Sequence, residues 1–172
     1  MARRRPNPQL GFTMIEVMLV IVVVGVLLTI AAPSFVTFTS SQKVKTASFD
    51  VYAAFLFARS EAIKRRQTVT VTPVSSDWKN GWTITTPDPA IVPIDPTITI
   101  TLRNQDALTG IVTSGAASVV YRLDGRLNGG ATVGVLIQPE VADATGTIKN
   151  RCIRVDLTGL PKTTTITDTV CP

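Results

Sequence analysis

GFTMIE at residues 11–16, followed by VMLVIVVVGVLLTIAA at residues 17–32, is the stretch around which the chain is organised. The apolar run holds no charged residue, and Thr29 is its only hydroxyl. With its flanks from Phe12 to Phe35, it approaches the roughly 20 residues that a helix needs to cross a bilayer. Glu16 falls within the first turns of that helix, where a carboxylate costs about 2.5–3.5 kcal/mol on insertion scales unless something compensates it. Glu16 therefore needs an explanation beyond membrane anchoring.

Residues 1–10, MARRRPNPQL, place three arginines on one side of the apolar run. The positive-inside rule keeps these arginines in the cytoplasm and sends the C-terminus outward. Two kinds of processing suit this arrangement. A secretory signal would be cut after the apolar region, near Ala31-Ala32, but Pro33 would then follow the cut directly, which is unfavourable. The alternative cut falls between Gly11 and Phe12 and keeps the helix.

The GFTMIE segment and its apolar helix closely resemble the class III leader of type IV pilins and type II secretion pseudopilins. In that family a membrane-embedded prepilin peptidase cuts after the glycine and N-methylates the new first residue. The resemblance assigns the cut to Gly11 and the methylation to Phe12. The family's glutamate at the fifth mature position corresponds to Glu16, and its proline at the twenty-second corresponds to Pro33.

The charge on Glu16 is consistent with this resemblance. Cleavage creates a positive amine at Phe12, and a carboxylate one turn along can pair with such an amine on a neighbouring subunit. A charge that is tolerated in the membrane only when paired favours assembly over the lone monomer. The alternative is that Glu16 lies at the membrane interface, snorkelling or protonated. Pro33 lacks a backbone donor and is expected to kink or locally melt the helix.

The sequence predicts three segments: a leader at residues 1–11, a transmembrane half-helix at 12–36, and a periplasmic or extracellular domain at 37–172. Apolar residues at spacings of three or four continue the helix to about Arg66. Alternating β-branched segments then predict strands at 68–72, 82–85, 97–102, 118–123, 132–137 and 152–157. The expected fold is α+β, one long helix packed on mostly antiparallel sheet.

This second part resembles the GspH/FimT branch of pilin-like proteins. The resemblance rests on ARSEAI at residues 58–63, Trp78 with Gly81-Trp82, YRLDGR at 121–126 and IRVDLTG at 153–159. We expect Trp78 and Trp82 to pack in the core rather than to contact a ligand.

Composition limits the remaining function classes. The chain has 17 Lys and Arg against 12 Asp and Glu, but three arginines precede the apolar run, which leaves 14 against 12 in the rest. The absence of histidine removes the commonest general base and metal ligand, so we expect no enzyme, no cofactor and no metal site. Cys152 and Cys171 predict a disulfide in an exported domain, or two reduced thiols in a cytosolic one.

Three functions are compatible with these features. The first is a minor pilin that enters, or primes, a type IV pilus. Its implied partners are prepilin peptidase, other minor pilins, the major pilin and the inner-membrane assembly platform, and its implied location is the inner membrane and then the filament. The second is a type II secretion pseudopilin.

The third is a DNA-binding minor pilin for natural transformation, a kind associated with a Gly-Arg-x-Arg motif after the last core strand. The aligned residues are Gly159-Leu160-Pro161-Lys162, which lack both arginines. Arg151, Arg154 and Lys162 could still form a weak phosphate patch, with salt-sensitive affinity. Nucleic acid is therefore the less favoured partner.

Overall fold

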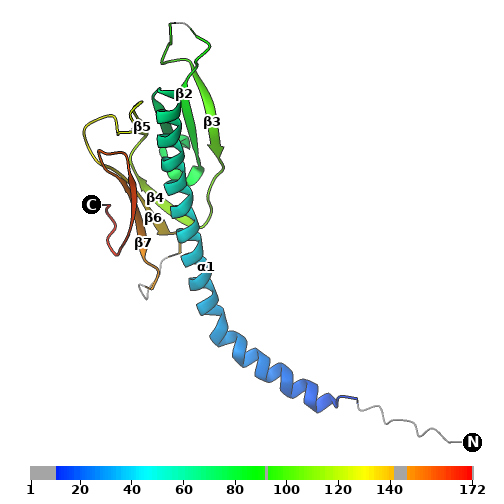
Figure 1. The fold of residues 1–172 in the computed structure, drawn as a ribbon. Helices are drawn as coiled ribbons and strands as arrows, with labels where there is room; N and C mark the ends of the chain where they lie inside the picture. The colour runs from blue at the N-terminus through cyan, green and yellow to red at the C-terminus, as the bar shows by residue number, and fades with distance from the viewer. Residues whose placement is uncertain (1–10, 92, 142–146, 172) are drawn as a thin grey trace, which may run out of the picture. The chain divides into compact units, whose positions relative to one another are not determined.

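The computed structural model describes residues 11–91, 93–141 and 147–171, without the side chains of residues 30–33. Its chain forms two compact units, Met1–Val36 and Thr37–Pro172, and each is described by itself (Figure 1). Residues 1–10 of the expected leader and the side chain of Pro33 lie outside this description, so the roles expected of them stay predictions.

Helix α1 runs from Met14 to Arg65 and begins and ends where the sequence supplies the signals for it. Glu16 lies in its first turn and Lys64 and Arg65 in its last, as the helix dipole favours. Arg66 adopts a left-handed conformation with φ of 54°, and the Gln67 amide donates back to the Ala62 carbonyl at 3.3 Å. Such a turn closes a helix C-terminus, so the predicted end near Arg66 is confirmed.

The length and the apolar content of α1 decide whether it could span a membrane. Within the described residues, no unbroken helix by itself combines the length and the apolar content of a membrane span. The segments Met14–Thr29 and Ser34–Arg65, taken together across a short break, do meet both conditions.

Two antiparallel sheets follow the helix in the Thr37–Pro172 unit. Sheet A has the strand order β3-β2-β1-β5 and sheet B has the order β4-β6-β7-β8. The strands of sheet A are β1 (Val69–Pro73), β2 (Trp82–Pro87), β3 (Thr99–Gln105) and β5 (Val119–Tyr121). Those of sheet B are β4 (Ile111–Gly115), β6 (Val133–Pro139), β7 (Asn150–Val155) and β8 (Pro161–Ile166). Two short 3-10 turns, η1 (Val74–Ser76) and η2 (Trp78–Asn80), join β1 to β2.

The α+β class and the six expected strands are confirmed, but the sheet is divided and two strands were not predicted. Strand β4 contains Thr113, Ser114 and Gly115, and β8 is rich in threonine, so neither shows the apolar alternation that marks a strand. Pro161 is the first residue of β8, a position where a strand tolerates proline.

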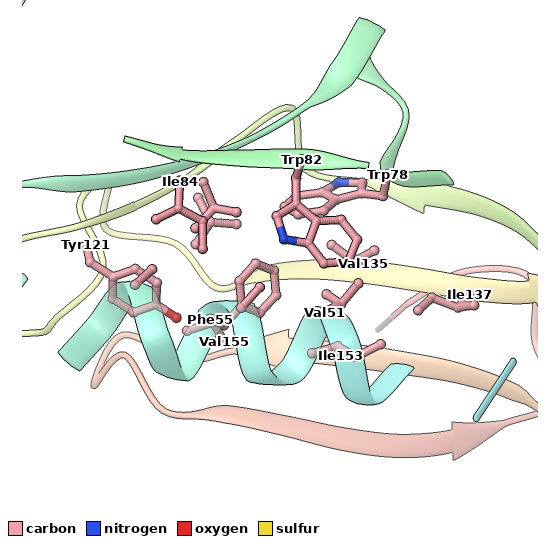
Figure 2. Packing of buried hydrophobic residues seen from close by; sticks show 14 of the residues in the cluster. Val51, Phe55, Trp78, Trp82, Ile84, Tyr121, Val135, Ile137, Ile153 and Val155 are labelled. Carbon is pink, nitrogen blue, oxygen red and sulfur yellow. The ribbon is translucent and has the colours of Figure 1, made fainter. Parts of the chain in front are cut away.

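The core lies between α1 and both sheets. Figure 2 shows Val51 and Phe55 of α1 near Trp82 of sheet A and Ile153 of sheet B, all of them fully or almost fully buried. The Phe55 ring meets the Trp78 ring edge-on, with centroids 5.5 Å apart. The indole of Trp78 also donates to the Ala116 carbonyl at 2.9 Å, which satisfies its buried N–H. Both tryptophans are therefore core residues, as expected.

Candidate functional site: the processed helix end and the surfaces of the domain

The predicted cleavage point lies immediately before α1. Gly11 and Phe12 are exposed and precede the helix. Thr13 caps it: its hydroxyl accepts from the Glu16 amide at 3.3 Å, and its own amide faces the Glu16 carboxylate at 3.5 Å. This is the reciprocal arrangement of a capping box. Because the second contact is long and exposed, the carboxylate remains accessible to a stronger donor such as an amine.

The first part of α1 presents an almost entirely apolar surface. Every large apolar side chain from Phe12 to Leu28 is at least 46% exposed. Thr29 is the only hydroxyl of residues 17–32, and it donates to the Val26 carbonyl at 2.7 Å, so this polar group is satisfied within the helix. A surface of this kind must be covered by lipid or by other helices.

Arg59 joins α1 to both sheets. Its Nε donates to the Gly125 carbonyl at 3.0 Å, in the turn after β5, and its Nη2 donates to the Thr158 carbonyl at 3.4 Å, in the turn after β7. Gly159 lies against the same carbonyl of Gly125 with φ of 80°, where a Cβ atom would overlap the oxygen. Arg59 and Gly159 both come from the segments that carry the family resemblance, and here their role is to hold two turns together.

The hydroxyl of Tyr121 is buried beside this junction. It has no hydrogen-bond partner within the described part of the chain. Burial raises the pKa of the phenol, with the Arg59 charge opposing and the Asp156 charge adding to the shift. Tyr121 therefore stays neutral and serves as a core residue.

The three residues considered for DNA contact do not share one face. Arg154 of β7 lies directly opposite Lys162 of β8. Arg151 is three positions from Arg154, and since side chains alternate along a strand, it points to the other face of sheet B. Lys162 also pairs with the Asp156 carboxylate at 3.8 Å. Arg154 and Lys162 lie opposite each other, whereas Arg151 shares only the lining of a groove with Lys162, and Lys162 already pairs with Asp156.

Asp156 is fixed by the turn that follows β7. The Thr158 amide donates to its Oδ1 at 2.9 Å, and the Thr158 hydroxyl donates to the same atom. The hydroxyl contact is the main reason that the pKa of Asp156 lies below its ordinary value, with Lys162 contributing. Asp156 thus stays charged beside Lys162 and weakens any phosphate attraction there.

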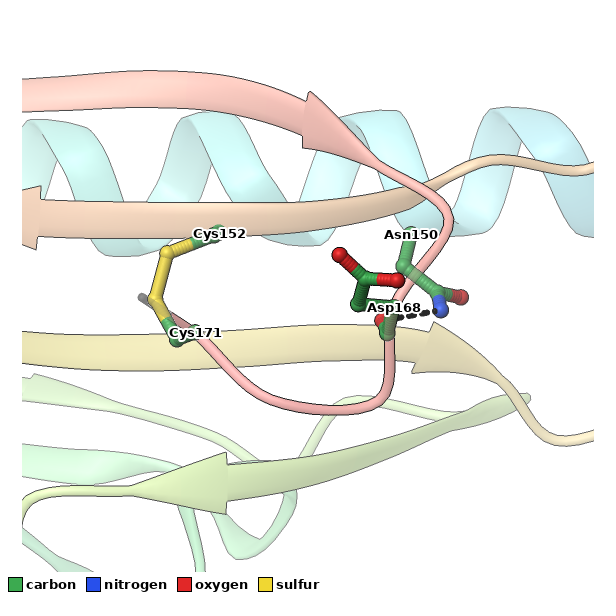
Figure 3. The surroundings of a disulfide bond; sticks show 4 residues. All are labelled: Asn150, Cys152, Asp168 and Cys171. Atoms are coloured by element: carbon green, nitrogen blue, oxygen red, sulfur yellow. Dashed lines mark hydrogen bonds between the residues drawn. A yellow bond between two sulfur atoms is a disulfide. The ribbon is translucent and has the colours of Figure 1, made fainter.

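Cys152 and Cys171 form a disulfide, with Cα atoms 5.5 Å apart (Figure 3). The Asn150 side chain donates to the Asp168 carbonyl at 2.9 Å and holds the same tail to β7. Gly134 of β6 lies beneath Cys171, since a Cβ atom there would come within 2.7 Å of the sulfur. The tail thus covers the face of sheet B that points away from the core, where Leu136 and Cys152 are buried.

No metal centre is present among the residues that the structure describes: no group of three Cys, Asp or Glu side chains is placed to hold an ion.

Two family models match the sequence. The model described as type II transport protein GspH matches residues 47–159. The model described as prokaryotic N-terminal methylation motif matches residues 6–32.

Known pilins are also similar in sequence. The chain is 28% identical over 143 residues to the type IV major alpha-pilin of Moraxella bovis, covering 83% of this chain and 86% of that protein. It is 33% identical over 79 residues to a fimbrial protein of Pseudomonas aeruginosa, covering 45% of this chain and 51% of that protein.

Solved structures share the fold at lower identity. The type IV minor pilin FimU of Pseudomonas aeruginosa superposes with a TM-score of 0.61 at 17% identity, covering 78% of this chain and 99% of that one. The minor pseudopilin EpsH of the Vibrio cholerae type 2 secretion system superposes with a TM-score of 0.54 at 13% identity, covering 72% of this chain and 97% of that one. The chain therefore has the pilin fold.

Proposed function

Because the chain belongs to the GspH family of pilin-like proteins and carries an N-terminal methylation motif, we propose that it is a minor pilin of a type IV pilus. Prepilin peptidase cuts it after Gly11 and methylates Phe12. The retained helix anchors it in the inner membrane with the domain in the periplasm. It then enters the pilus or primes its assembly, in contact with other minor pilins, the major pilin and the assembly platform.

The observation that carries this proposal is the environment of Glu16. The carboxylate lies one turn from the new N-terminus, and its only hydrogen bond within the described residues is the weak one from the Thr13 amide. On an otherwise apolar surface, its strongest available partner is the positive amine of a neighbouring Phe12. Pro33 would loosen the helix where it leaves the membrane, which suits packing in a filament.

A pilus is favoured over a secretion pseudopilus by the sequence relatives, which are named as a major alpha-pilin and a fimbrial protein. The disulfide that closes the C-terminus also favours a pilus over a secretion pseudopilus. A DNA-capturing role is not favoured, because Arg151 and Arg154 point to opposite faces of sheet B and because Lys162 is paired with Asp156. No catalytic step is assigned.

Glu16→Ala tests the proposal, with Thr13→Ala as the matched control. Both variants disturb the capping box, but only the first removes the carboxylate. We expect Glu16→Ala to insert into the membrane normally and to lose most of its incorporation into sheared filaments, while Thr13→Ala retains most of it. Equal incorporation of Glu16→Ala and the wild type would contradict the assembly role. Equal loss in both variants would assign Glu16 to capping alone.

A further inference from the structure

A groove runs between the second half of α1 and the outer strand of sheet B. Ser48, Phe49 and Tyr52 of α1 form one wall. The other wall consists of residues 161–164 of β8, with Arg151 of β7. All of these residues belong to the Thr37–Pro172 unit.

Strand β8 is an open edge. It pairs with β7 on one side, and within the described residues no strand pairs with its other side. Pro161 and Lys162 protect only its beginning, since proline and lysine discourage strand addition. The rest is Thr163 to Ile166, with high strand propensity and no charge. An edge of this kind offers unpaired backbone groups to an extended segment.

The side chains along the groove define the chemistry of the segment. Phe49 is 68% exposed although it is a large aromatic residue, and Tyr52 beside it is half-buried. Arg151 is half-buried and makes no ion pair within the described part of the chain. Among the described residues, no acidic side chain lines the groove. It therefore complements an apolar group together with a carboxylate.

We propose that this groove binds an extended acidic segment of a neighbouring pilin-like subunit. The segment adds to β8 as a further strand, places an apolar side chain on Phe49 and Tyr52, and directs a carboxylate to Arg151. A single-stranded nucleic acid would use the aromatic residues and the cation but would leave the strand edge unpaired. The inference rests on the proposed assembly function, because that function supplies the neighbouring subunit.

Site-specific photo-crosslinking in cells that build the filament tests the proposal with the full chain. A photoreactive residue replaces Thr163, which lines the groove, and in a control it replaces Thr101, an exposed threonine on β3, the edge strand of sheet A. The crosslinked peptide is identified by mass spectrometry. We expect position 163, and not position 101, to crosslink to an extended acidic segment of another pilin-like subunit.

Two charge reversals on β7 provide the matched comparison. Arg151→Glu places an acid in the groove, whereas Arg154→Glu makes the same charge change on the opposite face of the sheet. We expect Arg151→Glu to lower the crosslinking yield at position 163 about tenfold, which corresponds to a loss of roughly 1.4 kcal/mol in binding free energy. We expect Arg154→Glu to leave this yield unchanged. Equal yields in both variants, no crosslink at position 163, or a crosslink to nucleic acid or to the same chain would overturn the inference.

Membranes and sheared filaments are analysed separately, so that this inference and the proposed function can fail independently. Crosslinks in membranes from a protein that never enters filaments would support the groove and refute the pilus role. Incorporation into filaments without crosslinks at position 163 would refute the groove alone.

Discussion

Arg59→Met removes the hydrogen bonds that hold the two turns together and keeps a side chain of similar length. The bond from Nε to the Gly125 carbonyl is part-buried and 3.0 Å long, whereas the Nη2 bond to Thr158 is 3.4 Å and exposed. A hydrogen bond to a charged group contributes about 1.5–3 kcal/mol, and an acceptor left without a donor adds a further penalty. We expect the free energy of unfolding to fall by about 3 kcal/mol, nearly all of it from the Gly125 contact.

Thermal unfolding of the full-length protein in detergent, followed by circular dichroism, measures this loss. For a domain of this size, 3 kcal/mol corresponds to a Tm decrease of roughly 10 °C. Arg122→Met is the control, because Arg122 is an exposed arginine at the same turn. Arg59→Lys, which retains the charge but not the planar fork, should fall between the two. A Tm for Arg59→Met within about 2 °C of the control would refute the role assigned to Arg59.

Three further changes test other parts of the domain. Gly159→Ala should lower the free energy of unfolding by about 3 kcal/mol or more, because the added methyl group meets a carbonyl and the residue is held at a strained φ. Gly130 has a φ of 71° and open space around it. Denaturant titrations should therefore show a clearly smaller loss for Gly130→Ala. Glu61 accepts from Arg65 at 2.6 Å, which lowers the pKa of its carboxyl. The folded-state pKa is thus below the unfolded value, so this stabilisation is present above about pH 4.5 and is lost as the pH falls further. On acidification, the Tm of Glu61→Gln should therefore fall less than the Tm of the wild type. Parallel curves of Tm against pH for the two proteins would contradict the assignment. Reducing the Cys152–Cys171 disulfide should cost about 3 kcal/mol in the chain-entropy model, and mass spectrometry after thiol labelling should show both cysteines modified only after reduction.

Helix α1 could be predicted from the sequence because the signals for it are local. The apolar run, the basic flank and the Thr13–Glu16 spacing lie within a few turns of one another. The helix end near Arg66 follows from the same kind of signal, since the periodic apolar positions stop there.

The sheets could be predicted only in part. Strands with apolar alternation were found, whereas β8 was missed because its side chains are mostly polar on both faces. The run of threonines from 163 to 165 was the available signal, since β-branched residues favour strands even without apolar alternation. The separation of Arg151 from Arg154 could also have been predicted from the sequence, because residues three positions apart on a strand point to opposite faces of the sheet.

The contacts of Arg59 could not be predicted from the sequence. Its acceptors are 66 and 99 residues further along the chain, and nothing local indicates which turns meet. The groove beside Phe49 depends in the same way on the position of β8 against α1.

The N-terminus of the protein in purified filaments tests the central claim most directly. Intact-mass and terminal-peptide mass spectrometry should show a chain that begins at Phe12 with one methyl group on its amine. A chain that begins at Met1, or one that begins at Pro33 after a conventional signal cleavage, would contradict the claim that the apolar helix is retained and pairs through Glu16 with a neighbouring subunit.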